Sequence, residues 1–159
     1  MLEENREFLR HTVATVAYRG GKALRNAPGD FAGFRVGKAT RTPAQILAHV
    51  GDLFDWALTL AKGEETWCDS KPLAWMEEVG RFFAALQAFD EFLASGAPLV
   101  AGAEKLFQGP VADALTHIGQ ISMLRRLAEA PVRGENYFRA GIASGRVGPE
   151  QPSPQREFD

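Results

Sequence analysis

Two of the three histidines in this sequence occur with an aspartate in apolar segments, where their side chains could bind a metal ion. His49 lies in ILAHVGDLFDW, whereas Asp113 and His117 lie four residues apart in DALTHIGQISMLRRL. Side chains four residues apart on a helix project side by side from one face. Two imidazoles and one carboxylate from two facing helices would bind one divalent ion and leave coordination positions open for water or substrate. The spacing therefore favours a catalytic-type metal site at His49, Asp113 and His117.

A helical wheel places these residues beside apolar stripes. At about 100° per residue, His49 lies about 60° from Ile46 at the edge of one stripe, and His117 lies about 40° from Asp113 on a face that also carries leucines. A carboxylate on a buried face is costly unless it has a partner or a metal. The alternative is a boundary histidine and an aspartate that complements the N-terminus of a helix starting at Pro110. Spacing alone leaves both interpretations open.

The remaining residues with chemical potential give weaker signals. His11 belongs to the first apolar segment, where a surface or boundary position is the simpler interpretation. Cys68 is flanked by Trp67 and Asp69 and has only Lys71 as a nearby positive charge, so nothing indicates the lowered thiol pKa of a nucleophile. We assign no role to His11 or Cys68.

Four apolar segments with helical period must position the candidate ligands. Prolines border these segments rather than interrupt them, as expected for helices. We expect helices over about residues 2–26, 42–63, 72–95 and 110–130, and a short turn or helix over 135–143. Thr42, Pro43 and Gln45 predict a capping box at the start of the second helix. The segment 34–41 is ambiguous.

These elements predict one all-α domain, a four-helix bundle in which each helix buries a single stripe. The chain has 159 residues, of which 45% are hydrophobic, with 11 Phe and 3 Trp to fill a core. A chain of this length can bury one sizeable core without a staple. We expect the domain to span residues 1–148 and residues 149–159 to form a loose or edge-bound tail.

Charge and composition argue against two kinds of partner. The formal net charge is −2 and the pI is near 5.9, so the chain lacks the positive field needed to bind nucleic acid. No apolar stretch approaches the ~20 residues of a membrane helix. The single cysteine excludes an intramolecular disulfide, and the acidic N-terminal segment lacks the apolar run of a secretory signal. We therefore expect a cytoplasmic protein that contacts no membrane.

The segments ILAHVGDLFDW and DALTHIGQISMLRRLAEAPV resemble the two signature regions of the DinB/YfiT-like superfamily. This resemblance extends over nearly the whole chain. It implies a four-helix bundle, often dimeric, whose second and third helices run in the same direction. It also implies a metal bound by one histidine of helix two and two residues of helix four. His49 and His117 match that pattern, and Asp113 departs from it, because many members have histidine at this position.

The resemblance further implies a metal-dependent enzyme with a small-molecule substrate. A thiol S-transferase that uses a low-molecular-weight thiol is the first expectation, with hydrolysis by metal-activated water as a variant. The alternative is a non-catalytic stress-response or binding protein that keeps the bundle and the metal. Zinc or nickel is the favoured ion, and iron also suits two histidines and a carboxylate. Gln120 and Asp52 are candidates to contact the ligands, although surface exposure is the simpler expectation for Asp52. A homodimer is expected.

Overall fold

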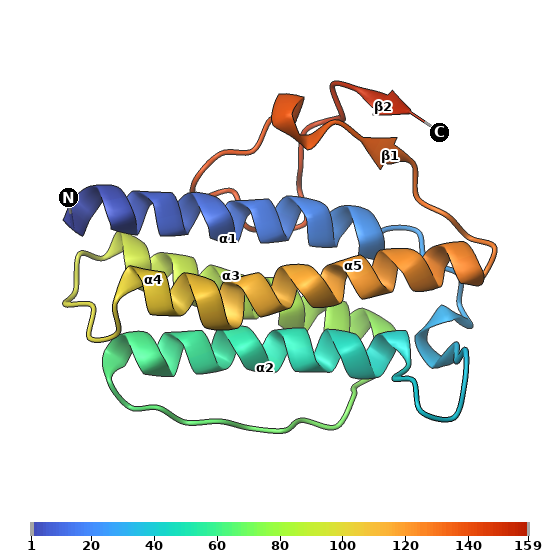
Figure 1. Cartoon of the computed structure of the whole chain (residues 1–159), viewed down its shortest axis with the longest axis horizontal. Coiled ribbons are helices and arrows are strands. Elements are labelled where there is room, and N and C mark those ends of the chain that lie inside the picture. The colour runs from blue at the N-terminus through green and yellow to red at the C-terminus, as the bar shows by residue number, and fades with distance from the viewer. Residues whose placement is uncertain (1, 159) are drawn as a thin grey trace.

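The computed structural model describes residues 2–158, which form a helical bundle (Figure 1). Three helices are continuous: α1 (Leu2–Leu24), α2 (Pro43–Lys62) and α3 (Trp75–Ala94). The fourth helical segment comprises α4 (Ala103–Leu106), a π-helical stretch (Phe107–Val111) and α5 (Ala112–Leu127). Strands in the described residues are limited to β1 (Gly134–Glu135) and β2 (Glu157–Phe158), which pair antiparallel. The predicted mostly helical fold with four helices is confirmed.

The order of the helices brings α2 and α3 side by side in the same direction, while α1 and α5 run the opposite way (Figure 1). The capping box predicted at Thr42 and Gln45 is present at the start of α2. At its end, Gly63 adopts the left-handed conformation (φ 85°) that terminates a helix at low cost. Residues 63–74 then return along the length of the bundle, so α3 begins at Trp75 rather than near residue 72.

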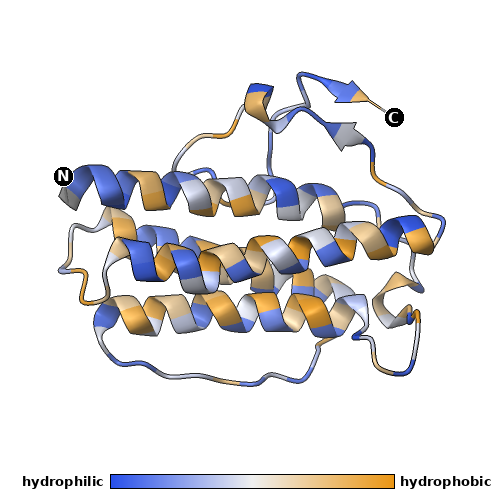
Figure 2. Cartoon of the chain, in the orientation of Figure 1, coloured by the Kyte–Doolittle hydropathy of each residue, from blue (hydrophilic) through white to orange (hydrophobic). Residues whose placement is uncertain are grey.

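One apolar core holds the helices together. Its largest fully buried side chains come from all the long helices and include Leu9, Leu47, Phe54, Phe82, Phe89 and Ile121. In Figure 2, hydrophobic residues recur along each helix between hydrophilic ones, as expected for helices that each bury one side. Full burial of one such side chain contributes about 1.5–3 kcal/mol. The packed core therefore supplies most of the stabilisation of the bundle.

The prediction that the fourth helix starts at Pro110 is wrong. Proline lacks an N–H group and its ring clashes with the carbonyl four residues earlier, which normally breaks a helix. Here the helical segment starts at Ala103 and widens into the π-helical stretch around Pro110, which accommodates the proline. Val111 and Ala112 both have right-handed helical backbone angles. Asp113 therefore follows earlier helical turns, and the interpretation of Asp113 as a residue at a free helix N-terminus is wrong.

The residues after α5 are attached to α1. The hydroxyl of Tyr18 donates to Glu135 over 2.5 Å, and Lys22 Nζ donates to Glu135 and Glu157 over 2.9 and 2.8 Å. The β1–β2 pair and the contact of Lys22 with Glu157 thus connect the end of the described chain to α1, while the expected division into a domain of residues 1–148 and a tail of residues 149–159 stays a prediction. A 3₁₀ turn at Tyr137–Arg139 lies within the predicted range 135–143. The end positions 1 and 159 of the expected ranges lie outside the described residues.

No helix of residues 2–158 is both long enough and apolar enough to cross a bilayer. The expectation of a cytoplasmic location stays a prediction.

Candidate metal centre

His49 on α2 meets Asp113 and His117 on α5, two helices that pack against each other. His49 Nε2 is 3.6 Å from Asp113 Oδ2, and His117 Nδ1 is 3.3 Å from Asp113 Oδ1. The imidazole centroids are 4.6 Å apart, with 55° between the ring planes. One potential ligand atom from each residue lies within 4.8 Å of the other two. The three residues predicted from the sequence therefore form a group that could hold a metal ion.

The spacing of these atoms fits one ion after a small side-chain adjustment. Donor atoms at 2.0–2.2 Å from a tetrahedral zinc ion are ~3.4 Å apart, by the geometry of a tetrahedron. The 3.6 Å separation of His49 from the Asp113 carboxylate already approaches that value. All three ligand atoms lie within 4.8 Å of one another, so only a modest approach of the side chains separates this arrangement from the tetrahedral spacing.

The orientation of His117 is set by the main chain. Its Nδ1 atom is 2.8 Å from the backbone carbonyl oxygen of Asp113. A carbonyl oxygen only accepts hydrogen bonds, so this contact places the ring proton on Nδ1 and leaves the Nε2 lone pair free for a metal. Metal-binding histidines commonly donate their other ring N–H in this way, which fixes the ring. Asp113 therefore contributes both a carboxylate and an orienting carbonyl.

Burial and charge keep His49 in its metal-binding form. Its side chain is 19% exposed, and burial lowers its pKa, with further lowering by the nearby His117 and Arg41. The Asp113 carboxylate opposes this effect and raises the pKa of His49. A lowered pKa favours the neutral imidazole at neutral pH, which is the form that binds metals.

The Asp113 carboxylate is more exposed than the wheel suggested. Its side chain is 45% exposed, compared with 13% for His117. Asp113 therefore needs no metal to compensate a buried charge. Three converging donors and the fixed orientation of His117 support the candidate site instead.

Trp67 places an aromatic ring beside the candidate ligands. Its ring is 5.6 Å from that of His49 and 5.7 Å from that of Trp56, both in edge-to-face geometry. Trp67 is 45% exposed and belongs to the segment 63–74 that runs along α2. The sequence interpretation missed this residue, because a single tryptophan in a connection without periodicity gives no signal of its position.

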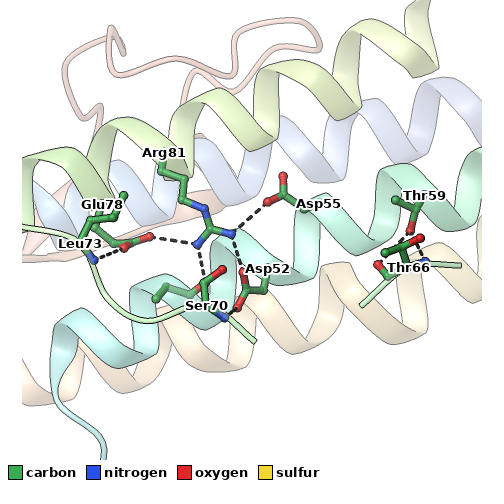
Figure 3. A network of polar contacts seen from close by, with 9 residues as sticks. Asp52, Asp55, Thr59, Thr66, Ser70, Leu73, Glu78 and Arg81 are labelled. Carbon is green, nitrogen blue, oxygen red and sulfur yellow. Dashed lines mark hydrogen bonds and ion pairs between the residues drawn. The ribbon is translucent and has the colours of Figure 1, made fainter. Parts of the chain in front are cut away.

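Asp52 forms no hydrogen bond with His49 among the described contacts and instead anchors the segment that carries Trp67. Its carboxylate accepts hydrogen bonds from the Ser70 amide, over 2.9 Å, and from the Arg81 guanidinium (Figure 3). Asp52 is only 2% exposed, so the expectation of surface exposure is wrong. The parallel packing of α2 and α3 brings Arg81 to Asp52, which the sequence alone does not reveal.

Arg81 is the centre of this polar network (Figure 3). It also donates to the Ala48 carbonyl at 3.1 Å, to Glu78 at 3.2 Å and to Asp55 at 3.0 Å. Hydrogen bonds to these carboxylates raise the pKa of Arg81 despite the opposing effect of burial. The guanidinium therefore stays charged and links α2 to α3 at Ala48, next to the candidate ligand His49.

Two further hydrogen bonds fasten the ends of the same segment. The Thr66 amide donates to Thr59 Oγ1 over 3.0 Å, and the Leu73 amide donates to Glu78 over 2.8 Å (Figure 3). The Glu78 side chain is 0% exposed, so its carboxylate is fully engaged with Leu73 and Arg81. These bonds hold the segment against α2 at Thr66 and against α3 at Leu73, and thereby fix the backbone on both sides of Trp67.

Each candidate ligand opens onto a surface hollow. His49 lines one of about 410 Å³ with Arg41 and Lys71, and His117 lines another of about 510 Å³. Gln120 is exposed and lines the His117 hollow, which places it near the site but with no hydrogen bond to a ligand among the described contacts. His11 and Cys68 are exposed and do not belong to the ligand group.

Comparison with known proteins provides no relative from which to assign a family. No family model matches the chain, and no curated protein or solved structure matches it significantly. Membership of the DinB/YfiT-like superfamily therefore stays a prediction that these comparisons neither support nor contradict.

Proposed function

We propose that this protein binds one divalent metal ion through His49, Asp113 and His117 and acts as a metal-dependent enzyme. Transfer to or from a low-molecular-weight thiol is the reaction that we favour, with hydrolysis as the variant. The observation that carries the proposal is the convergence of two imidazoles and one carboxylate, with the ring of His117 already oriented by a backbone carbonyl.

The donor set fits the proposed ion. Two nitrogens and one carboxylate oxygen suit zinc, nickel and non-haem iron. Three protein ligands leave coordination positions for a substrate, as in catalytic rather than structural sites. The half-exposed Asp113 and the hollows beside His49 and His117 give small molecules access to those positions.

A divalent ion held here would lower the pKa of a thiol that binds to it and so supply a thiolate at neutral pH. The chain contributes the positioning. The Asp113 carbonyl holds the His117 ring, and Trp67 packs edge-to-face against His49. No fourth histidine, cysteine or acidic residue of residues 2–158 joins the ligand group. The hydrolytic variant would need a separate general base, so this observation favours thiol transfer.

Metal analysis tests the first half of the proposal. Protein stripped with a chelator should take up one equivalent of zinc or nickel, measured by elemental analysis and calorimetry, and iron is tested under anaerobic conditions. His49→Ala and His117→Ala should lose binding while keeping their helicity. Asp113→His should bind, because it replaces one competent donor with another, whereas Asp113→Leu should not. The exposed His11 provides the control, since His11→Ala should bind like the wild type.

A conjugation screen tests the second half. The metal-loaded protein is incubated with glutathione, bacillithiol or mycothiol and a panel of electrophiles, and product is followed by mass spectrometry. Turnover that disappears in His117→Ala supports the transferase. Tight metal binding with no turnover of any thiol would replace it with a non-catalytic binding protein. Equal metal binding by the wild type and both histidine variants would refute the site itself.

A further inference from the structure

The hollow that begins at His117 continues along α5 as far as Leu127. Ten residues of helix separate these two positions, which corresponds to ~15 Å at 1.5 Å per residue. Its volume of about 510 Å³ lies within the range of 300–1,000 Å³ typical of small-molecule sites. The metal centre therefore lies at one end of an elongated hollow.

The walls of this hollow are mainly apolar. Val36, Met123 and Leu127 line it and are 54%, 57% and 52% exposed, and Ile46 and Leu124 form further parts of the wall. Single exposed apolar side chains are normal on a protein surface, whereas several that share one concave site indicate binding of an apolar group. The hollow is thus suited to an aliphatic or aromatic body.

Arg41 is the one charged residue among those that line the hollow. It lies directly before Thr42, the N-cap of α2, and it also lines the hollow beside His49. Among the described residues, no carboxylate forms an ion pair with Arg41, in contrast to Arg10 and Arg81. Arg41 thus shares one hollow with His49 and the other with His117. This guanidinium is therefore available to a ligand beside the metal centre.

We propose that this hollow binds a small amphipathic anion. Such a ligand has an aliphatic or aromatic body and one carboxylate-type group, which Arg41 binds. A guanidinium and a carboxylate form two parallel hydrogen bonds, which orients the ligand as well as attracting it. The exposed amide of Gln120 supplies further hydrogen bonds within the same hollow. The assignment deepens the proposed function by naming the class of substrate that reaches the metal, although binding to Arg41 itself does not need the ion.

Ligand-observed NMR titration of the metal-free protein tests this proposal with a matched pair of probes, 4-phenylbutanoate and the neutral 4-phenylbutan-1-ol. The wild type should bind the anion more tightly than the alcohol. Because a hydrogen bond to a charged group contributes about 1.5–3 kcal/mol, Arg41→Gln should weaken binding of the anion about 10- to 100-fold and leave binding of the alcohol unchanged. Lys71 lines only the other hollow, so Lys71→Gln should behave like the wild type.

A second variant tests the apolar wall. Leu127→Ser should weaken binding of both probes, since Leu127 lies at the far end of the hollow. Leu127 is 52% exposed and outside the buried core, so the variant should fold like the wild type. Equal affinity for anion and alcohol, or an Arg41→Gln variant that binds both like the wild type, would overturn the assignment. A separate variant distinguishes loss of the metal site from loss of the anion site. His49→Ala should lose the metal but keep 4-phenylbutanoate binding, because His49 does not line this hollow.

Discussion

Replacement of Arg81 by glutamine should destabilise the protein strongly, because Arg81 is the cationic partner of two carboxylates that are removed from water. The side chains of Asp52 and Glu78 are 1% and 0% exposed, and that of Arg81 is 21% exposed. Removing one partner of a buried ion pair typically costs 3–5 kcal/mol, since the other charge is left without compensation. We therefore expect Arg81→Gln to lower the free energy of unfolding by about 3–5 kcal/mol.

Urea and thermal unfolding, followed by circular dichroism, measure this loss. For a domain of 150–250 residues, each kcal/mol shifts Tm by about 2–4 °C, so the expected decrease is roughly 6–20 °C. Arg126→Gln is the matched control, because Arg126 is exposed and makes no hydrogen bond or ion pair in the described structure. It should stay within about 0.5 kcal/mol of the wild type.

A further variant distinguishes two causes of the lost stability in Arg81→Gln, the unpaired buried charges and the loss of packing. A triple variant with Arg81→Met, Asp52→Asn and Glu78→Gln removes the charges together and should be more stable than Arg81→Gln, since no charge stays buried and unpaired. A loss below about 1 kcal/mol in Arg81→Gln would refute the reasoning, because the two carboxylates would then have other compensation. A triple variant less stable than the single one would show that the hydrogen bonds themselves, rather than the unpaired charges, dominate.

Three further predictions test other parts of the structure. Cu²⁺ bound at the candidate site should quench tryptophan fluorescence, because the ring of Trp67 is 5.6 Å from that of His49 and the ring of Trp56 is 5.7 Å from that of Trp67. A double variant with Trp56→Phe and Trp67→Phe, which keeps Trp75, should lose most of this quenching, and quenching that persists in it would place the ion elsewhere. The hydrogen bond from Lys22 lowers the pKa of Glu157 below its ordinary value of 4.5, so this contact stabilises the fold above that pH and is lost as the pH falls through the lowered value. Thermal unfolding from pH 6 to pH 3 should therefore show a steeper loss of stability in the wild type than in Lys22→Met, and parallel curves would contradict the assignment. The expected homodimer predicts a sedimentation mass of twice the 17.4 kDa chain mass, and a mass of one chain at micromolar concentration would contradict it.

The parts of the fold that depend on local chemistry could be predicted from the sequence. The start of α2 follows from Thr42, Pro43 and Gln45, whose side-chain and backbone preferences act within one helical turn. Its end follows from Gly63, which adopts the backbone conformation that glycine tolerates best. The ligand set could also be proposed from sequence, because the i,i+4 spacing of Asp113 and His117 is itself a local geometric feature.

The parts that depend on contacts between distant segments could not be predicted in this way. Asp52 looks like a surface residue on the wheel, and only the parallel packing of α2 and α3 supplies Arg81 as its partner. Trp67 reaches His49 because hydrogen bonds from the backbone of residues 66, 70 and 73 hold its segment against the bundle. The hydrogen bond that orients His117 is accepted by the backbone carbonyl of Asp113, and a pattern of side-chain types does not predict a backbone contact.

The π-helical stretch explains how one helix provides both a buried face and an exposed ligand. In an uninterrupted α-helix, Asp113 would lie about 20° from Leu106, seven residues earlier, and so on its fully buried face. The π-helical turn at Phe107–Val111 has one more residue than an α-helical turn, so Leu106 and Val111, five residues apart, lie on the same face of the helix. Both side chains are 0% exposed. Asp113 then lies about 200° from Val111, whereas the buried Ala114, Ile118 and Ile121 lie at about 280–340°. Of the buried α5 residues, only Leu124, which is the most exposed of them at 8%, lies on the side of Asp113, at about 220°. Because of this offset, the carboxylate reaches His49 at the edge of the core while keeping contact with water, which makes the proline-induced irregularity part of the site.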